Sequence, residues 1–511
     1  MTKHRAFCGA VAALVATVLL AAGGHAWADD PGDATSDVTV EDPAKATSDV
    51  PAKSTSDAAA SKSLIELAPI VVDINRRYFK FYGDPNTVNG GIRERSYLTD
   101  NWAGGGLRDK LVDAGVYFDV AMTQWVGGNA YGGIDGRANY FGSLDLFANL
   151  DTAKLSNDFW PGATIFLHGE IAWGKDIQDP KGLERSVGAT IPANYDITMP
   201  LATNTGKFYL SEYYIVQALS PKVSAWIGQM NGAGLIDGNA FANSEKHQFL
   251  NTVLVDNPTV GPFAPYTAFT IAGVWLPTTE HVLIAGVMDQ NGSATETVAE
   301  SYDADDGSVF VGSYGFLPQW GGLPGRYQIV GAYSNMDIAA YEVGDRLALL
   351  GELVGLVPIK EKTNNGVTII TADQYLFVKD IERQIGWGLF FRFGYSPKDR
   401  NAIDQFYSFG VGGRGLLIPG RDLDFWGLGW GGTHLSSDLR KDLELLGSDN
   451  IKPFEHLIEA FYNIELVPWA HLTFDVQFIV NPIGAQIADS FGSVNDDGLA
   501  VVVGSRLQID F

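Results

Sequence analysis

Charged and amide side chains recur at every second position of several segments that are otherwise apolar. In residues 457–466, Glu459, Asn463 and Glu465 alternate with aliphatic and aromatic residues. In residues 384–396, Arg392 lies opposite a face of apolar and aromatic side chains. Polar groups on one face of such segments could replace the water around a solute that moves along them. The spacing therefore points to the binding of polar solutes along a wall.

The same residues lack the spacing that catalysis or metal binding requires. Glu459 and Glu465 resemble the carboxylate pair of a glycosidase, but along one strand they would lie about 20 Å apart. That separation exceeds those that glycosidases use. The histidines never fall at metal-ligand spacing, and the single cysteine, Cys8, lies near the N-terminus. We therefore predict no catalytic residue, no metal and no cofactor.

The elements that carry these residues are predicted to be strands, because apolar and polar residues alternate at period two. In residues 499–511 the apolar face ends at Phe511, whereas Arg506 and Gln508 share the other face. Tryptophan and tyrosine residues gather near strand ends, which is typical of membrane interfaces. These aromatic residues are Trp226, Trp275, Trp387, Tyr395, Trp426, Trp430 and Trp469. The sixteen predicted strands are 115–126, 139–151, 162–173, 206–219, 222–230, 266–276, 280–289, 307–317, 325–334, 367–379, 384–396, 404–413, 423–432, 455–467, 469–480 and 499–511.

The connections between the predicted strands alternate between short and long. Ser220-Pro221 and residues 277–279 are short, whereas 174–205, 231–265 and 335–366 are long. Transmembrane barrels combine tight periplasmic turns with large external loops. A barrel near this size leaves an aqueous channel, and an even strand number places both chain ends in the periplasm. The predicted fold is all-β, a 16-stranded antiparallel transmembrane β-barrel with a short N-terminal periplasmic segment.

The N-terminal part of the chain has a different composition. Residues 1–28 combine a positive start, an apolar run and the Ala26-Trp27-Ala28 pattern, which predicts a cleaved signal peptide. Residues 29–63 are rich in Ala, Ser, Thr, Asp, Lys and Pro and predict a disordered periplasmic tether. Residues 64–114 could form a short helical or plug segment. The predicted barrel therefore occupies residues 115–511.

Charge and hydropathy narrow the possible partners. The formal net charge is −25, which argues against nucleic acid, whose phosphates require Lys and Arg. After the N-terminus no apolar stretch reaches the ~18 residues of a spanning helix. A membrane crossing by this chain must therefore use strands.

Several stretches resemble the carbohydrate-selective porins of the OprB family. They are YLTDNWAGGGLRDKLVDAGVYFDVAMTQWVGGNAYGG at 97–133, YFGSLDLFANLDTAKL at 140–155, GRGLLIPGRDLDFWGLGW at 413–430, ELVPWAHLTFDVQFIVNPIG at 465–484 and the terminal GLAVVVGSRLQIDF. The resemblance covers residues 95–511. The chain departs from the family at NWAGGGLR, where a tighter tryptophan-glycine-glycine pattern is usual. The resemblance implies a monomeric or homotrimeric barrel in outer-membrane lipid that passes glucose and related monosaccharides by diffusion.

The resemblance also implies an arginine-containing constriction, for which Arg392 is the strongest candidate. Arg392 either belongs to this constriction or forms an ion pair within the wall. Strand parity predicts further residues that face the lumen: Asp119, Asp145, His168, Glu170, Glu459, Asp475, Arg506 and Gln508. Possible rim groups in the loops are Arg137, Trp173, Lys175, Asp176, Asp237 and Asn239.

Three other functions are consistent with a barrel. A general small-solute porin would conduct without sugar selectivity. An adhesive or interaction barrel would bind partners through its loops and have a narrow or plugged lumen. A barrel enzyme such as a lipase or protease would need a serine or acidic constellation, and we identify none.

Overall fold

A computed structural model describes residues 106, 110, 111 and most of 114–511. The gaps within 114–511 are residues 157–159, 175–186, 191–192, 195–205, 233–235, 302–306, 342–359, 381–383, 491 and 493–496. The predicted signal peptide and tether lie outside the described residues, as does nearly all of segment 64–114. These three assignments stay predictions.

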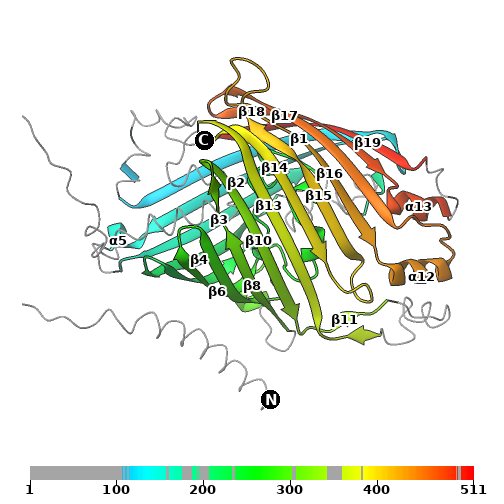
Figure 1. Ribbon diagram of the computed structural model, residues 1–511, viewed down its shortest axis with the longest axis horizontal. Coiled ribbons are helices and arrows are strands. Elements are labelled where there is room, and N and C mark those ends of the chain that lie inside the picture. Colours follow the sequence, from blue (N-terminus) through cyan, green and yellow to red (C-terminus); the bar gives the residue numbers. More distant parts are fainter. Residues whose placement is uncertain are drawn as a thin grey trace, which may run out of the picture.

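Sixteen long antiparallel strands form a closed barrel, as predicted (Figure 1). Each strand pairs with its neighbours along the chain, and β1 also pairs with β19, which closes the sheet. The long strands are β1 Val116–Gly132, β2 Ala138–Asp151, β3 Ala163–Gly174, β4 Phe208–Ser220, β5 Val223–Met230, β6 Ala268–Thr278, β7 His281–Asp289, β8 Ser308–Phe316, β10 Leu323–Ser334, β13 Asn365–Asp380, β14 Ile385–Tyr395, β15 Ile403–Arg414, β16 Phe425–Leu435, β17 Phe454–Val467, β18 Ala470–Val480 and β19 Leu499–Asp510.

The remaining elements are short. Three two-residue strands are β9 Gln319–Trp320, β11 Ile338–Ala339 and β12 Glu361–Lys362. The helices are α5 Thr152–Leu155, α9 Thr252–Val255, the 3₁₀ helix η4 Pro258–Val260, α10 Val298–Ser301, α12 Ser437–Leu446 and α13 Ile483–Ser490. None of the helices in the described ranges combines the length and the hydropathy that a helical membrane crossing requires.

The first strand differs most from its predicted bounds, because it continues to Gly132 rather than ending at residue 126. Its glycine-rich end pairs with β19, where Gly127 lies opposite Gly504 and Gly132 opposite Ala500. A β-bulge between Asn129 and Tyr131 lets the register continue. A composition that resembles a loop therefore extends the wall beyond the predicted strand.

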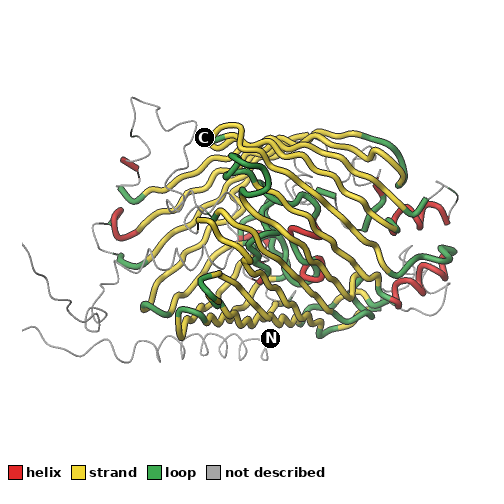
Figure 2. Tube along the Cα trace, turned by 45° about the horizontal axis from the view of Figure 1, so that its top comes forward, coloured by secondary structure: helices red, strands yellow, loops and turns green. Residues whose placement is uncertain are grey.

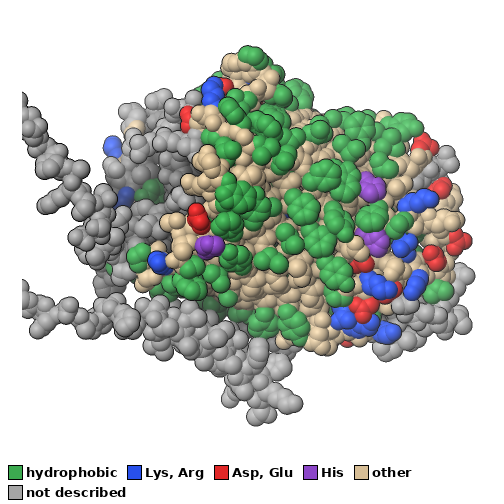
Figure 3. All heavy atoms as spheres, viewed as in Figure 1, with side chains coloured by type: hydrophobic (Ala, Val, Ile, Leu, Met, Phe, Trp, Pro, Cys, Tyr) green, Lys and Arg blue, Asp and Glu red, His purple; other side chains and the backbone are tan. Residues whose placement is uncertain are grey.

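The two faces of the wall have the predicted polarity. Along β14, Arg392 is fully buried, whereas Leu389 and Phe391 are exposed on the outer face. Figure 3 shows hydrophobic side chains spread over the outside of the strands. The prediction for Trp226 is wrong: it is 2% exposed and shares the inner face with Ser224, to which its Nε1 donates a hydrogen bond of 3.0 Å. Strand parity therefore places this tryptophan inside the barrel, in the middle of β5.

Candidate functional site

The connection between β5 and β6 folds into the barrel. Figure 2 shows loop and short helical segments among the surrounding strands. Helix α9 and the 3₁₀ helix η4 lie in this connection, and Asn251 and Asn257 cap their N-termini. We call residues 236–267 the inward segment. This segment occupies part of the lumen.

Arg392 of β14 holds the inward segment from one side. Its Nε donates to Asp237 Oδ1 at 2.9 Å, and its Nη1 donates to the carbonyl of Leu254 at 3.0 Å. Its Nη2 donates to the carbonyls of Ala242 and Val255. Arg392 therefore forms a buried ion pair, but the partner belongs to the inward segment and not to a neighbouring strand. Its guanidinium acts on the constriction by positioning this segment.

Glu459 of β17 and Arg506 of β19 hold the same segment at a second place. The backbone N–H groups of Leu250 and Asn251 donate to Glu459 Oε1 and Oε2 at 2.6 and 3.1 Å. Arg506 donates to the carbonyl of Glu245 through Nη1 and to that of Gln248, at 3.0 Å, through Nη2. Both predicted lumen residues are inside the barrel and are occupied by backbone groups of the inward segment.

A row of glycines on β16 lets the segment approach the wall. A Cβ at Gly429 would lie 2.7 Å from Leu254 Cδ1, and one at Gly431 would overlap Val253 Cγ1. Phe249 packs beside them, with its ring centroid 4.8 Å from that of Phe461. The sequence analysis missed this docking surface. The available signal was the alternation of glycine with Trp426, Leu428 and Trp430 in FWGLGWGG, which removes the inward side chains of one strand.

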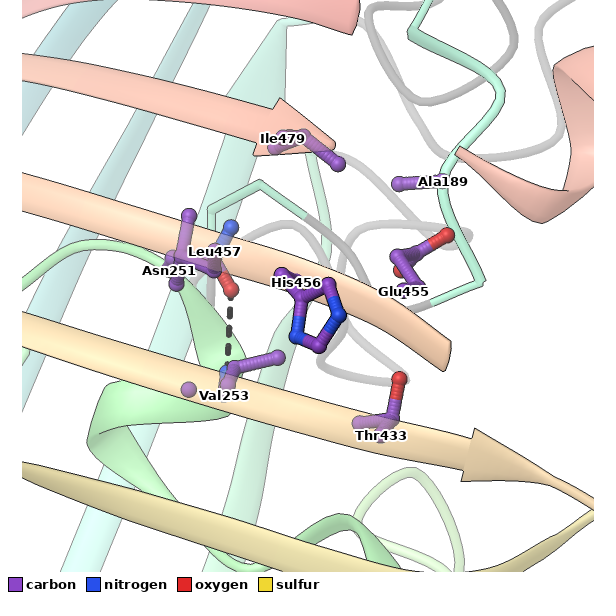
Figure 4. Close-up of a pocket in the computed structure, with 9 residues that line it drawn as sticks. Ala189, Asn251, Val253, Thr433, Glu455, His456, Leu457 and Ile479 are labelled. Atoms are coloured by element: carbon purple, nitrogen blue, oxygen red, sulfur yellow. Dashed lines mark hydrogen bonds between the residues drawn. The ribbon is translucent and has the colours of Figure 1, made fainter. Parts of the chain in front are cut away.

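A small pocket remains where the inward segment meets β16, β17 and β18 (Figure 4). Asn251 and Val253 line it from the segment, and Thr433 and Glu455 line it from the wall. The Glu455 carboxylate also accepts hydrogen bonds of 3.0 and 2.9 Å from the backbone N–H of Thr190. The long connection between β3 and β4 therefore also contacts this wall.

The wall of β2, β3 and β4 carries a polar cluster, consisting of Asp145, His168, Glu170 and Glu212. Asp145 pairs with Glu170 across β2 and β3, and His168 pairs with Glu212 across β3 and β4. The imidazole lies between two carboxylates, with Nδ1 3.1 Å from Glu212 Oε1 and Nε2 3.3 Å from Asp145 Oδ1. All four residues are buried. Like charges on opposed positions repel, so the imidazole between them is a stabilising contact.

The inward segment also reaches this cluster. Lys246 Nζ lies 2.9 Å from Asp145 Oδ2, and Tyr266 Oη donates to Glu170 Oε1 at 3.1 Å. Glu170 Oε2 has no hydrogen-bond partner among the described residues. The predicted residues Asp145, His168 and Glu170 therefore come together on the inner face beside the inward segment.

Cross-strand contacts place the remaining lumen candidates on the inner face. Asp119 is buried in β1 opposite Phe147. Asp475 accepts a 2.9 Å hydrogen bond from Gln477, and Gln508 accepts one of 2.7 Å from Thr123. These strand-parity predictions agree with the observed orientation, whereas contact with a solute stays a prediction.

The loop candidates are distributed differently from the predicted rim. Arg137 forms an exposed ion pair with Asp135 at 2.6 Å. The structure contradicts the prediction for Trp173, which lies on the outer face because its parity on β3 matches Ile171, and its Nε1 donates to Tyr140 Oη at 2.9 Å. Asp237 and Asn239 belong to the inward segment rather than to the rim. Lys175 and Asp176 lie outside the described residues.

The closed antiparallel barrel, its apolar outer face and its inward segment define an outer-membrane porin. The family model of the "Carbohydrate-selective porin, OprB family" matches residues 177–511. This match spans more than half of the chain, and the chain belongs to the OprB family of carbohydrate-selective porins. The family is one of channels and not of enzymes.

The chain is also similar to two further proteins. A solved structure described as the high pH structure of Pseudomonas putida OprB is 21% identical, has a TM-score of 0.67 and covers 82% of this chain and 99% of its own. An uncharacterized protein of Aquifex aeolicus (strain VF5) is 22% identical over 317 residues, which are 62% of this chain and 78% of that protein. At this identity the structural likeness shows the fold alone.

Proposed function

We propose that this chain conducts monosaccharides such as glucose by passive diffusion along the wall of β2, β3 and β4. The observation that carries the proposal is the cluster of Asp145, His168 and Glu170 on the inner face of this wall, which the inward segment borders through Lys246. Carboxylate oxygens accept hydrogen bonds from sugar hydroxyls and so replace the water that a sugar loses in a narrow path. His168 and Lys246 contact Asp145 in the same cluster. Membership in a carbohydrate-selective family supports this class of solute.

We further propose that the barrel lies in the outer membrane with both chain termini in the periplasm. The short connections at residues 220–222 and 278–280 then face the periplasm, and the long ones face outward. In this arrangement residues 1–28 direct export, residues 29–63 form a periplasmic tether and residues 64–114 precede the barrel.

Single-channel current through the full-length mature protein in planar bilayers tests the sugar path. We expect glucose to reduce the open-channel current of the wild-type protein, and Glu170→Gln to weaken this block several-fold. The substitution keeps the size of the side chain and the acceptor for Tyr266, but it removes the charge. Glu280→Gln is the matched control, because Glu280 is exposed in a turn outside the lumen.

The outcomes separate the alternative functions. A current that glucose does not block would show a general small-solute porin. The absence of any current from folded protein would favour an interaction barrel. An equal loss of block in both glutamine variants would show that Glu170 has no special contact with the sugar.

A further inference from the structure

The connection between β15 and β16 differs from other connections at the same end of the barrel. Its tip, Leu416–Pro419, is apolar and exposed, with Leu417 at 55% and Ile418 at 46% of full exposure. By contrast, the connection after β4 is Pro221-Lys222, and the one after β6 is Thr279-Glu280. Figure 1 shows the β15–β16 connection as a projecting loop, and Figure 3 shows hydrophobic side chains on the projection. An exposed apolar tip calls for a partner. The β8–β10 connection at the same end also exposes an apolar residue, Trp320, at 56%.

The base of this loop is held on two sides. Arg421 donates to Asp424 at 2.7 and 2.8 Å and to the carbonyl of Glu465 at 2.8 Å, which attaches the loop to β17. Asp424 Oδ2 also accepts a 2.7 Å hydrogen bond from Tyr462. On the other side, Lys379 of β13 forms an ion pair with Asp422. The tip therefore stands on a base that β13 and β17 fix.

The backbone at the tip adopts a conformation that costs free energy. Leu416 has a φ of +69°, in the left-handed region that disfavours residues with a branched or bulky side chain. Gly415 before it and Gly420 after it also have positive φ values, of 67° and 79°. Such conformations persist where the surroundings impose them and are frequent at functional sites. Here the hydrogen-bonded base imposes the turn, which directs three large apolar side chains to the surface.

The tip is continuous with the surface that already faces lipid. Phe377 near the end of β13 and Leu466 near the end of β17 are 47% and 53% exposed, and both strands contact the base of the loop. The side chains of Lys379 and Arg421 are 48% and 38% exposed beside the tip. Cations that border an apolar surface are suited to the phosphates of a lipid headgroup layer.

We propose that the Leu416–Pro419 tip inserts into the glycerophospholipid leaflet at the short-turn end of the barrel. In the orientation proposed above, this is the periplasmic leaflet. Lys379 and Arg421 then lie at the level of the phosphates, and the tip adds a fixed anchor below the apolar belt. A tip of four residues can bury far less surface area than the ~800 Å² that each partner contributes to a stable protein interface. Lipid is therefore favoured over a second copy of the chain as the occupant.

Spin labels at single cysteines test the insertion. The single cysteine of the sequence, Cys8, lies in the predicted signal peptide, so the mature protein needs no other substitution. Leu417→Cys carries a nitroxide in the mature protein refolded into phosphatidylethanolamine–phosphatidylglycerol vesicles. Leu389→Cys is the control in the lipid-facing belt, and Lys222→Cys is the control in a polar turn. We expect the ratio of collisions with oxygen to collisions with a water-soluble nickel chelate to be several-fold higher at 417 than at 222.

Two results would overturn the proposal. A ratio at 417 equal to that at 222 would place the tip in water. Shielding from both reagents together with spin–spin broadening would show that a second copy covers the tip.

A second variant keeps the test independent of labelling. The double substitution Leu417→Ser with Ile418→Ser should lower the urea midpoint of unfolding in the same vesicles, whereas Thr278→Ser with Thr279→Ser should not. Equal midpoints would contradict insertion. Glucose block should be the same in the wild type and in both double variants, because the tip lies outside the lumen.

Discussion

Two walls of this barrel face the inward segment with opposite chemistry. The docking wall, formed by β14, β16, β17 and β19, presents glycines and uses Arg392, Glu459 and Arg506 to bind the backbone of the segment. The polar wall, formed by β2, β3 and β4, presents carboxylates around His168 and leaves one oxygen without a partner among the described residues. A polar residue that faces the lumen can therefore either position the constriction or contact the solute. Its hydrogen-bond partners decide which.

Removing the central cation of the docking wall should have the largest effect. Arg392→Ala leaves Asp237 buried without its partner, which typically costs about 3–5 kcal/mol. We expect the free energy of unfolding to fall by this amount in urea titrations of the refolded barrel, and the open-channel current to rise and become noisy as the segment loosens. Wild-type stability and current would show that the segment is held without Arg392.

The same substitution on both walls compares them directly. In Glu459→Gln, one of the two carboxylate oxygens that accept backbone N–H groups becomes an NH₂ group, which is itself a donor. The lost hydrogen bond should cost about 1–3 kcal/mol of stability. Glu170→Gln keeps an acceptor for Tyr266 and should therefore cost less stability than Glu459→Gln, while it weakens glucose block. Urea titrations and single-channel currents measure both properties. If Glu459→Gln weakened glucose block without loss of stability, the assignment of the two walls would be wrong.

A methyl group on the glycine surface tests close approach without changing charge. Gly431→Ala places a Cβ against Val253, and such overpacking typically costs about 1–3 kcal/mol. Gly312→Ala on β8 is the matched control, because no atom lies within 4 Å of its added Cβ. We expect faster proteolysis of the inward segment only in the first variant. Equal proteolysis of the two variants would show that the glycines of β16 do not contribute to the docking of the inward segment.

A substitution in the exposed ion pair of Arg137 should have the smallest effect. Arg137 and Asp135 form an ion pair with side chains 39% and 37% exposed, and exposed pairs contribute about 0–1 kcal/mol. Arg137→Ala should change neither the unfolding midpoint nor the glucose block. A marked change in block would place Arg137 on the solute path.

Several features of the barrel could be predicted because they are local. The side chains of successive residues in a strand point to opposite faces, so the burial of Glu459, Arg506 and Arg392 follows from position along one strand. The sixteen long strands and the length of their connections follow from the same pattern. Trp226 and Trp173 are the failures. Trp226 was assigned to the membrane interface and Trp173 to the rim of the pore. Strand parity instead places Trp226 inside the barrel and Trp173 on its outer face.

The partners of the lumen residues could not be predicted in this way. Arg392 contacts Asp237 at a separation of 155 residues, Glu459 contacts Leu250 at 209 and Arg506 contacts Glu245 at 261. No periodic pattern connects positions so far apart. The spaced glycines of β16 are a partial signal, since a strand that gives up its inward side chains leaves room for another element.

The sequence by itself determined a closed barrel with an apolar outer face, because alternation along each strand is a property of the extended chain. The tertiary structure alone decided which partner each inward charge finds. The physical reason is that a buried charge must find partners. The fold of the inward segment supplies those partners along the docking wall, and on the polar wall it contributes Lys246 to Asp145 and Tyr266 to Glu170.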